Sequence, residues 1–400
     1  MIFLGTKKSG SSRDAIIKAK DLGYHTIVLT DNEKQILDKR SYPEIDSMLR
    51  CDFGDIDKIK ELINYLVTWQ IDVRAIVSFI DPYCSIAAKL SNEYNLSNFS
   101  YLAMEKMQNK LLCREVLKNS MYNPKYIVLD KNNYQDYNGI KEMLPVVIKY
   151  IESKGSKDVY FCNSLETYVQ YVNQLFKQYK NCIILVEEFL DGKQYIVEAV
   201  AINNQIIIEA IIEQEIKFIN DHFIITGYSL GINYPEPFFK KLKYAVDEIL
   251  ELHKFENGPC HLEMRYVKGE WKLIEINPRI SGAGMNQFLE IGLGYSLVEE
   301  HLKLSLNLSP NFKPRHEINT FAEYVILDTE GTLERITGRT QVLRSDGVKY
   351  VYVKPRKGSY LTTPTSLGNR YAFVIAIWDS KDKAMKNAKN AASKINFHLM

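Results

Sequence analysis

The first hundred residues alternate short apolar runs with stretches of helical periodicity. The runs at 2–5, 25–30 and 74–79 are rich in β-branched residues and too short for helices, which is typical of buried strands. Between them, residues 13–22 and 56–69 carry apolar positions at helical spacing. Strands that alternate with helices predict a parallel sheet with crossover helices. We therefore expect a doubly wound domain in this part of the chain.

Three further blocks follow, and changes in the pattern set their boundaries because the chain contains no low-complexity linker. The second block has a polar helix and then strands around another helix, and the third is rich in strands. The fourth combines strands with a helix that carries Ala384, Ala388, Ala391 and Ile395 on one apolar stripe. The predicted domains are residues 1–100, 101–194, 195–308 and 309–400.

The charge balance of the chain is close to neutral. Its 51 Lys and Arg residues against 49 Asp and Glu residues give a net charge of +2, which is too small to bind a nucleic-acid backbone or an anionic membrane by electrostatics alone. The apolar run before Lys7 and Lys8 is too short for a signal peptide, and no later stretch offers the ~20 apolar residues of a membrane helix. We expect a cytoplasmic protein that acts on small molecules, with no nucleic-acid or membrane partner.

Two common kinds of cofactor site are not indicated. The six cysteines are scattered without a Cys-x-x-Cys pair or a neighbouring His cluster, which favours free thiols over a zinc site or disulfides. The first strand is followed by Gly5 and Gly10 in the sequence GTKKSG, which lacks the Gly-x-Gly-x-x-Gly spacing of dinucleotide-binding loops. A nicotinamide-dependent dehydrogenase is therefore not favoured.

Residues 261–279, HLEMRYVKGEWKLIEINPR, have the pattern of a β-hairpin, although Leu273 interrupts the strict alternation. If the loop is the three residues 268–270, Glu263 lies opposite Glu275 on one face of the hairpin. Two facing carboxylates repel each other unless a cation lies between them. A loop of two or four residues would instead place the two carboxylates on opposite faces, where both would simply be hydrated.

The same face carries further groups that suit a hard cation. In that register Asn277 lies opposite His261, so an amide oxygen joins the two carboxylates. Oxygen ligands without a His–Cys set favour Mg²⁺, which usually keeps substrate phosphates in its remaining positions. Pro278 and Arg279 then add a rigid turn and a guanidinium suited to clamping a phosphoryl or acyl-phosphate oxygen.

Earlier segments offer contacts for a nucleotide. A buried strand ends near Lys149, and the loop after it contains Gly155 and Ser156, whose backbone and hydroxyl groups can cover phosphates. An apolar run ends at Glu187, which can accept a hydrogen bond from the exocyclic amine of adenine. Taken alone, each segment is equally compatible with a solvated hairpin tip or an ordinary sheet edge, and Lys110 on its polar helix with a lysine that faces water.

The order of these pieces along the chain resembles the ATP-grasp carboxylate–amine ligase superfamily over roughly residues 100–300, and the whole chain looks most like the L-amino acid ligases, which form dipeptides. The resemblance implies a multidomain α/β and α+β fold: a doubly wound domain, two α+β lobes and a C-terminal α+β cap. It implies that ATP phosphorylates a carboxylate and that an amine then attacks the acyl phosphate. It also implies amino acid substrates, ATP with two Mg²⁺ ions or Mn²⁺ in their place, and a lobe at 145–190 that closes over ATP, and it allows a homodimer.

The resemblance also assigns roles to individual residues. Glu263, Glu275 and Asn277 match the metal ligands, and Arg279 matches the catalytic arginine that steadies the transferring phosphoryl group. The implied ATP contacts are Lys110, Lys149, Gly155, Ser156, Glu187, Glu188, Leu190 and Gln194, and the implied substrate contacts are Ser281, Gly282, Gly284 and Tyr228.

The chain departs from the family pattern at several positions. Ser153 and Asp158 stand in the phosphate loop where glycines are frequent, which can stiffen the loop. Gln194 stands where many relatives have a ribose-binding acid, and residues 225–228 read ITGY where several dipeptide-forming relatives have acid-Thr-Gly-His. Substrate choice is therefore open. The nearest alternative is another ATP-grasp ligase, a bicarbonate-dependent carboxylase or a purine-pathway enzyme, ahead of a dehydrogenase or a non-catalytic ATP-binding protein.

Overall fold

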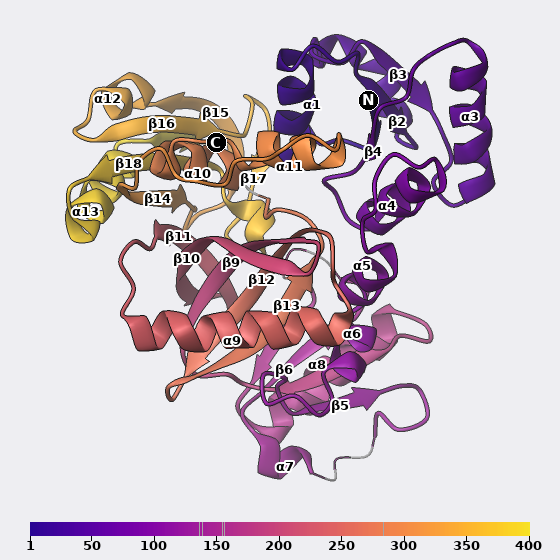
Figure 1. Ribbon diagram of the computed structural model, residues 1–400. Coiled ribbons are helices and arrows are strands. Elements are labelled where there is room, and N and C mark those ends of the chain that lie inside the picture. Colours follow the sequence, from indigo (N-terminus) through magenta and orange to yellow (C-terminus); the bar gives the residue numbers. More distant parts are fainter. Residues whose placement is uncertain (136, 138, 154, 156, 283) are drawn as a thin grey trace.

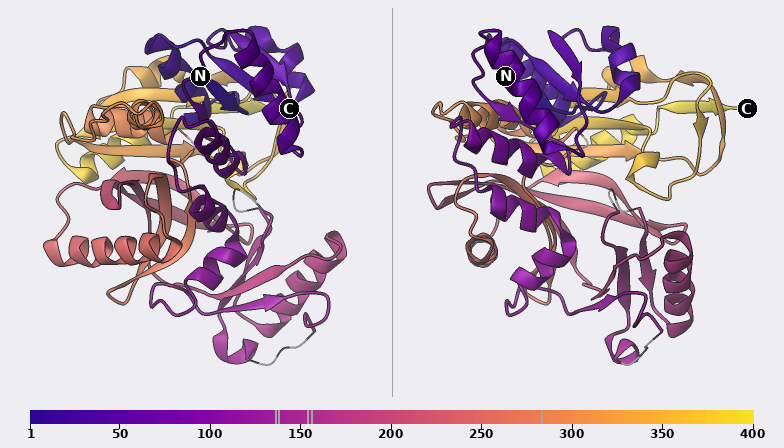
Figure 2. Two further views of the ribbon diagram at one scale, coloured as in Figure 1. Left: turned by 45° about the vertical axis from the view of Figure 1, so that its right-hand side comes forward. Right: turned by 90° about the vertical axis from the view of Figure 1, so that its right-hand side faces the viewer.

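The computed structural model describes residues 1–400 except 136, 138, 154, 156 and 283. Four blocks follow one another along the chain. The first and the last lie side by side at one end of the molecule, the third occupies the middle, and the second forms the opposite end (Figures 1 and 2). The third block therefore contacts the other three and is the one on which any shared site must be built.

The N-terminal block is the predicted doubly wound domain. Its elements are β1 (Ile2–Leu4), α1 (Ser11–Asp21), β2 (Ile27–Thr30), α2 (Glu33–Leu37), a 3₁₀ turn (Lys39–Ser41), β3 (Ser47–Arg50), α3 (Ile56–Thr68), β4 (Ile76–Val77) and α4 (Tyr83–Glu93). The strands form a parallel sheet in the order β3-β2-β1-β4, with α1 packed on one face and α3 and α4 on the other. Strand β3 was not predicted, because its SMLR sequence is only half-buried and has no apolar run.

The second block is a small lobe reached through two short helices. Its elements are α5 (Tyr101–Gln108), α6 (Lys110–Val116), β5 (Tyr126–Leu129), α7 (Ile140–Met143), β6 (Val146–Tyr150), β7 (Val159–Cys162), α8 (Leu165–Gln178) and β8 (Ile184–Glu188). The strands form an antiparallel sheet in the order β5-β8-β6-β7. Helix α8 covers one face, because Tyr168, Val172 and Leu175 lie on one side of it and are buried against the sheet.

The third block contributes most of a long antiparallel sheet. Its elements are β9 (Lys193–Ile202), β10 (Gln205–Ile219), β11 (His222–Leu230), α9 (Glu236–His253), β12 (Gly258–Val267), β13 (Glu270–Asn277), α10 (Met285–Leu293) and α11 (Leu297–Ser305). The sheet order is β13-β12-β9-β10-β11-β14-β18-β16, so the last three strands come from the C-terminal block. Helix α9 crosses the front of β9, β12 and β13 and buries Leu242, Val246 and Ile249 against them (Figure 1).

The C-terminal block thus extends the sheet of the third block. Its elements are β14 (Asn319–Val325), β15 (Gly331–Thr337), α12 (Arg339–Leu343), β16 (Val348–Val353), β17 (Tyr360–Leu361), a 3₁₀ turn (Leu367–Asn369), β18 (Ala372–Trp378), α13 (Lys381–Ala392) and β19 (Asn396–Leu399). A small second sheet has the order β17-β15-β19. The stripe predicted on the last helix is correct for Ala384, Ala388 and Ala391, but α13 ends before Ile395, which is buried beside Ala391 from outside the helix. The domain boundaries themselves stay a prediction.

Two further expectations concern the chain as a whole. All six cysteines are buried free thiols, as predicted. Within the described part of the chain, none of the helices has both the length and the apolar character that crossing a membrane requires.

Candidate active site

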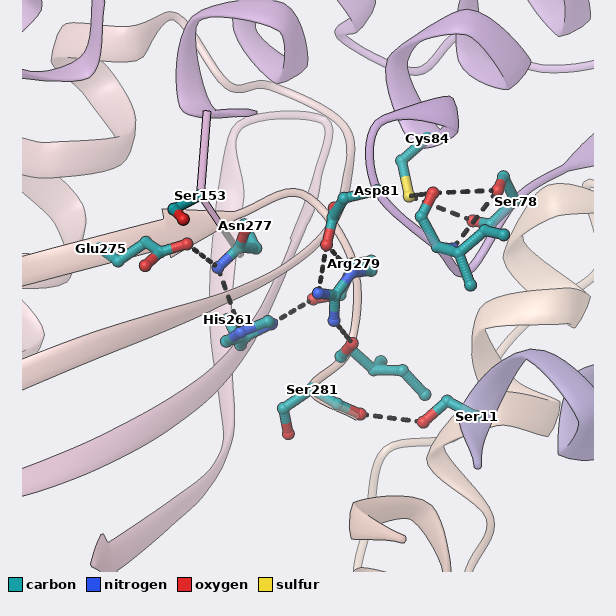
Figure 3. Close-up of polar contacts among 12 residues, drawn as sticks. Ser11, Ser78, Asp81, Cys84, Ser153, His261, Glu275, Asn277, Arg279 and Ser281 are labelled. Atoms are coloured by element: carbon teal, nitrogen blue, oxygen red, sulfur yellow. Dashed lines mark hydrogen bonds and ion pairs between the residues drawn. The ribbon is translucent and has the colours of Figure 1, made fainter. Parts of the chain in front are cut away.

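The β12–β13 hairpin brings the predicted metal ligands together. Glu263 is paired with Glu275, and His261 with Asn277, in the register expected from the sequence. The amide of Asn277 donates to Glu275 at 3.2 Å and lies 3.4 Å from Nε2 of His261 (Figure 3). Two carboxylates and an amide therefore lie on one face of the sheet. Among the residues that the structure describes, no three His, Cys, Asp or Glu side chains lie together as a metal site. A cation at this place would therefore need Asn277 in addition to Glu263 and Glu275.

The turn that joins the two strands differs from the expected one. It has two residues, Lys268 and Gly269, with φ angles of 51° and 88°, and not three. A two-residue turn alone would put the carboxylates on opposite faces. A β-bulge at Ile274 adds one residue to β13 and returns Glu275 to the face of Glu263. The adjacent apolar residues Leu273 and Ile274, which interrupt the alternation in the sequence, were the signal for this bulge.

The facing carboxylates are electrostatically uncompensated. Burial, and next the charge of Glu275, raise the pKa of Glu263 to about 7. Lys149 and Arg279 act in the opposite direction but do not cancel this effect. The only hydrogen bond that Glu263 receives among the described residues comes from the amide of Gln194, at 3.3 Å. A divalent cation between the two carboxylates would relieve this repulsion, so the residues present fit Mg²⁺.

A buried group of three charges lies behind the carboxylate pair. The two oxygens of Glu187 accept hydrogen bonds from Nε of Arg114 at 2.7 Å and from Nζ of Lys149 at 2.6 Å. Burial raises the pKa of Glu187, but the charges of Arg114 and Lys149 outweigh burial and hold it at about 2. Nη2 of Arg114 also donates to the carbonyl oxygen of Ile274 at 2.6 Å, at the bulge. The charge group therefore links α6 and the small lobe to the hairpin.

This geometry adds one residue to the site. Both oxygens of Glu187 accept hydrogen bonds from Arg114 and Lys149, and the residue also lines the cleft, so its contact with adenine stays a prediction. Arg114 was not recognised as a site residue in the sequence. The sequence could have indicated Arg114, because it follows Lys110 by four residues and so lies on the same face of α6.

Side chains from inside and outside the predicted phosphate loop contact its described residues. Nζ of Lys110 donates to the carbonyl oxygen of Ser153 at 2.8 Å, so this lysine lies against the loop and does not simply face water. The hydroxyl of Ser153 donates to Asp158 at 2.7 Å. Asp158 has a φ of 52°, a left-handed conformation that glycine adopts more easily than other residues. An aspartate at this position therefore has a conformational cost. Ser156 lies outside the described residues.

A guanidinium and an aromatic ring form the other end of the cleft. Arg265 donates to the carbonyl oxygen of Leu190, and its Nε donates to Oε1 of Gln194 at 3.0 Å. Its guanidinium lies 5.1 Å from the centre of the Phe189 ring. Arg265 was missed in the sequence, although it follows Glu263 by two residues and so shares its strand face. Of the predicted ATP and metal residues, those that line the cleft are Lys110, Lys149, Gly155, Glu187, Glu188, Leu190, Gln194, Glu263 and Glu275.

Arg279 is tied to the N-terminal domain. Its Nε donates to Oδ2 of Asp81 at 2.9 Å, and Nη2 bonds to the same oxygen (Figure 3). Its carbonyl oxygen lies 2.8 Å from Nδ1 of His261. Burial, and next the charge of Arg279, lower the pKa of His261 to about 4, so this imidazole is neutral at pH 7. Asp81 was also missed, although it follows β4 near the carboxyl edge of a parallel sheet, where site residues are common.

The loop after Arg279 is bonded on both sides. The hydroxyl and backbone N–H of Ser281 donate to Glu198, the latter at 3.1 Å, and the carbonyl oxygen of Ser281 accepts from Ser11 at 2.8 Å. Glu198 is fully buried, and burial raises its pKa to about 8. Gly282 is exposed in the same loop. Glu198, on β9, was missed, although a single acid within the apolar run YIVEAVAI was a signal for a buried carboxylate.

The remaining predicted substrate contacts lie apart from the cleft. Gly284 has a φ of 81° at the start of α10. Tyr228 is buried on β11, where its hydroxyl accepts from Nη1 of Arg370 at 3.3 Å and its ring lies 5.4 Å from that of Tyr324. The structure therefore places Tyr228 beside the C-terminal block and does not bring it to the carboxylate pair.

Two family profiles match this chain. Residues 142–287 match the ATP-grasp domain, and residues 323–400 match the L-amino acid ligase C-terminal domain 2. The chain therefore contains an ATP-grasp domain, followed by a C-terminal domain of the type found in L-amino acid ligases, as the resemblance in the sequence indicated.

Three similar proteins are identical to this chain at about a fifth of the aligned positions. An uncharacterized protein, y4rH, of Sinorhizobium fredii is 23% identical over 82% of this chain and 69% of its own length. The L-arginine-specific L-amino acid ligase of Bacillus subtilis is 22% identical over 48% of each chain. Dapdiamide A synthase of Enterobacter agglomerans is 22% identical over 59% of this chain and 58% of its own. The match thus covers only about half of the last two relatives.

The fold is also similar to that of solved structures. An L-amino acid ligase from Bacillus licheniformis superposes with a TM-score of 0.83 at 17% identity, over 100% of this chain and 98% of that chain. Phosphoribosylglycinamide synthetase from Anaerococcus prevotii gives 0.75 at 17% identity, over 100% and 99%. These values establish the ATP-grasp fold over the full chain.

Proposed function

We propose that this protein is an ATP-dependent ligase that joins two L-amino acids into a dipeptide and releases ADP and phosphate. The observation that supports this most strongly is the facing pair of Glu263 and Glu275 in a cleft that also holds Lys110 and Lys149. Carboxylates that face each other next to two lysines suit a metal-bound polyphosphate better than a merely structural role. The match of residues 323–400 to the C-terminal domain of L-amino acid ligases favours amino acids as substrates.

Each group in the cleft has a role in this reaction. Glu263, Glu275 and Asn277 would hold Mg²⁺, which would offset the negative charge that develops during phosphoryl transfer. Lys110 and Lys149 bind the phosphates. We assign adenine recognition to the strand end at Glu187, Glu188 and Leu190, all three of which line the cleft. Gln194 would hydrogen-bond a ribose hydroxyl.

Arg279 is the proposed catalytic residue. Its guanidinium would orient the substrate carboxylate towards the terminal phosphate of ATP and stabilise the oxyanion when the amine attacks the acyl phosphate. Asp81 fixes this side chain from the N-terminal domain, so the two domains must be docked for the arginine to be in position. Ser281 and Gly282 would face the amino acid.

ATP entry requires the small lobe to move. The cleft encloses about 120 Å³, which is below the ~300 Å³ at the lower end of common ligand sites. The small lobe would therefore open to admit ATP and close again, which keeps water away from the acyl phosphate.

One alternative keeps the same chemistry with other substrates. The fold is also similar to that of phosphoribosylglycinamide synthetase, with a TM-score of 0.75, and fold similarity at 17% identity says nothing about the acid and amine that are joined. The C-terminal match favours amino acids over bicarbonate or a phosphoribosyl amine.

The proposal is tested by ADP release from Mg-ATP across all pairs of the twenty amino acids, with the product identified by mass spectrometry. Dipeptide formation in step with ADP release is the expected result. With ¹⁸O in the carboxylate of the first amino acid, one ¹⁸O is expected in each phosphate released. ADP release that responds only to bicarbonate or to phosphoribosyl amines would contradict the dipeptide reaction and leave the ATP-grasp chemistry in place.

A further inference from the structure

A second cavity lies between the N-terminal domain and the C-terminal block. It encloses about 400 Å³, which is within the ~300–1,000 Å³ range of sites for small molecules. The loop before α1 and the start of α10 form one side, and strands β14, β16 and β18 form the other. Gly284, a predicted substrate contact, lines this cavity and not the nucleotide cleft.

Four aromatic rings cover the C-terminal side of the cavity. The ring of Phe373 lies 5.1 Å from that of Tyr324, 5.7 Å from Tyr350 and 5.4 Å from Tyr352. A Cβ atom at Gly284 would lie 2.7 Å from Cζ of Phe373, so only glycine allows the loop to approach this ring. The cavity therefore presents a continuous aromatic surface beside the loop that follows Arg279.

Arg370 is a buried cation at the edge of this aromatic surface. Its side chain is 8% exposed, and its guanidinium lies 4.1 Å from the centre of the Tyr324 ring. Its hydrogen bonds go to the hydroxyl of Tyr228 and to two carbonyl oxygens, each at 3.3 Å. Among the residues that the structure describes, no carboxylate lies within ion-pair distance of it. The charge of Glu263 acts on Arg370 from the nucleotide cleft, but all direct hydrogen-bond partners of the guanidinium are neutral, so a ligand carboxylate would lower the cost of burying it.

Two of the other cations that line the cavity are paired with carboxylates, and Lys7 and Lys354 line it as well. Lys8 pairs with Asp38 at 3.0 Å, and Arg13 pairs with Glu44 at 2.6 Å. Lys354 donates to a backbone carbonyl at 2.7 Å. Charge at the α1 side is therefore partly neutralised, whereas Arg370 is not. Arg370 is the only buried cation among the described residues that line the cavity, so we place the carboxylate of the ligand there, and competition by phosphate tests the alternative.

We propose that this cavity binds one of the two amino acid substrates, and that this substrate is an aromatic L-amino acid. This inference rests on the proposed function. Its carboxylate pairs with Arg370, and its ring packs against Tyr350, Tyr352 and Phe373. Asp14, on the α1 side of the cavity, supplies the negative charge that an ammonium group requires. The hydrogen bond from Ser11 to Ser281 connects this side of the cavity to the loop after Arg279.

The test is calorimetric binding of L-phenylalanine and L-alanine to the full chain with Mg²⁺ and a non-hydrolysable ATP analogue. L-Phenylalanine is expected to bind more tightly than L-alanine by roughly tenfold or more. Tyr352→Ala is expected to weaken L-phenylalanine binding roughly 5- to 10-fold, whereas Tyr352→Phe keeps the ring and most of the affinity. Arg370→Met is expected to cost roughly 10- to 100-fold, and Arg370→Lys less. Tyr360→Ala, at a 64% exposed tyrosine outside the cavity, is the matched control.

Three outcomes would overturn the inference: equal affinity for the two amino acids, no effect of Tyr352→Ala, or displacement of L-phenylalanine by inorganic phosphate or ribose 5-phosphate. If the Arg370 variants do not fold, the Tyr352 pair and the phosphate competition still decide. Binding also separates this inference from the proposed function. ADP release with other amino acids but no L-phenylalanine binding would refute the inference alone, whereas binding without amino-acid-dependent ADP release would refute the ligase activity alone.

Discussion

The buried charge group of Arg114, Glu187 and Lys149 allows a quantitative prediction. Glu187→Gln removes the only negative charge of this group and leaves two buried cations that face each other. The pKa of Glu187 falls from its ordinary value of 4.5 to about 2 in the folded protein. Since each pKa unit corresponds to about 1.4 kcal/mol, the ionised carboxylate contributes about 3 kcal/mol to folding at pH 7. The side chains of Glu187 and Arg114 are 5% and 3% exposed, so solvent screening reduces this value little.

The sign of the pH dependence follows from the direction of this shift. A carboxylate whose pKa is lowered by folding stabilises the protein above its unfolded pKa, near 4.5, and this contribution is lost as the pH falls towards 2. The stability difference between the native chain and Glu187→Gln should therefore be full at pH 7 and shrink below about pH 4.5.

Urea unfolding followed by circular dichroism measures this difference. Glu188→Gln is the matched control, because Glu188 is the next residue on β8 and its carboxylate accepts from the backbone N–H of Lys125 alone among the described residues. We expect a loss of about 3 kcal/mol for Glu187→Gln and a much smaller loss for the control. Equal losses for the two variants, or a difference that grows in acid, would refute the role given to Glu187.

Three further predictions concern the chemistry of the site. Glu275→Gln and Arg279→Ala should each abolish ADP formation with an unchanged circular dichroism spectrum, and full amine-dependent ADP release by either variant would contradict the assignment. Asp81→Asn should lower kcat by roughly tenfold or more, with the KM for ATP nearly constant, because it frees Arg279 without touching the nucleotide; a change in the KM for ATP alone would count against this. Because the pKa of Glu263 is about 7, protons should compete with Mg²⁺ below that pH. The Mg²⁺ concentration for half-maximal ADP release should therefore be higher at pH 6 than at pH 8. An Mg²⁺ requirement that does not change with pH would argue against Glu263 as a ligand.

The local pattern of apolar and polar residues was sufficient to predict the hairpin that carries the candidate site, but not strand β3, which has no apolar run. The strands β12 and β13 alternate apolar and polar residues clearly enough to predict that Glu263 and Glu275 face each other. The turn was predicted one residue too long, and a bulge at Ile274 compensated for the difference. The bulge could have been predicted, since two apolar residues in succession, Leu273 and Ile274, mark the position where the strand takes an extra residue.

Contacts between distant segments could not be predicted in this way. Asp81 and Arg279 lie 198 residues apart and meet only because the N-terminal domain docks on the third block. The pairing of Glu198 with Ser281 likewise depends on how β9 lies beneath the loop after β13. The Glu187 side chain shows a related limit: nothing in its sequence neighbours indicates that its charged partners, Arg114 and Lys149, come from α6 and β6.

The metal assignment is tested most directly by counting bound Mn²⁺ with electron paramagnetic resonance in the presence of a non-hydrolysable ATP analogue. The native chain should bind Mn²⁺, and Glu263→Gln and Glu275→Gln should each lose most of this binding while keeping the circular dichroism spectrum. Binding of Mn²⁺ that is unchanged in both variants would contradict the view that these two carboxylates form the metal site.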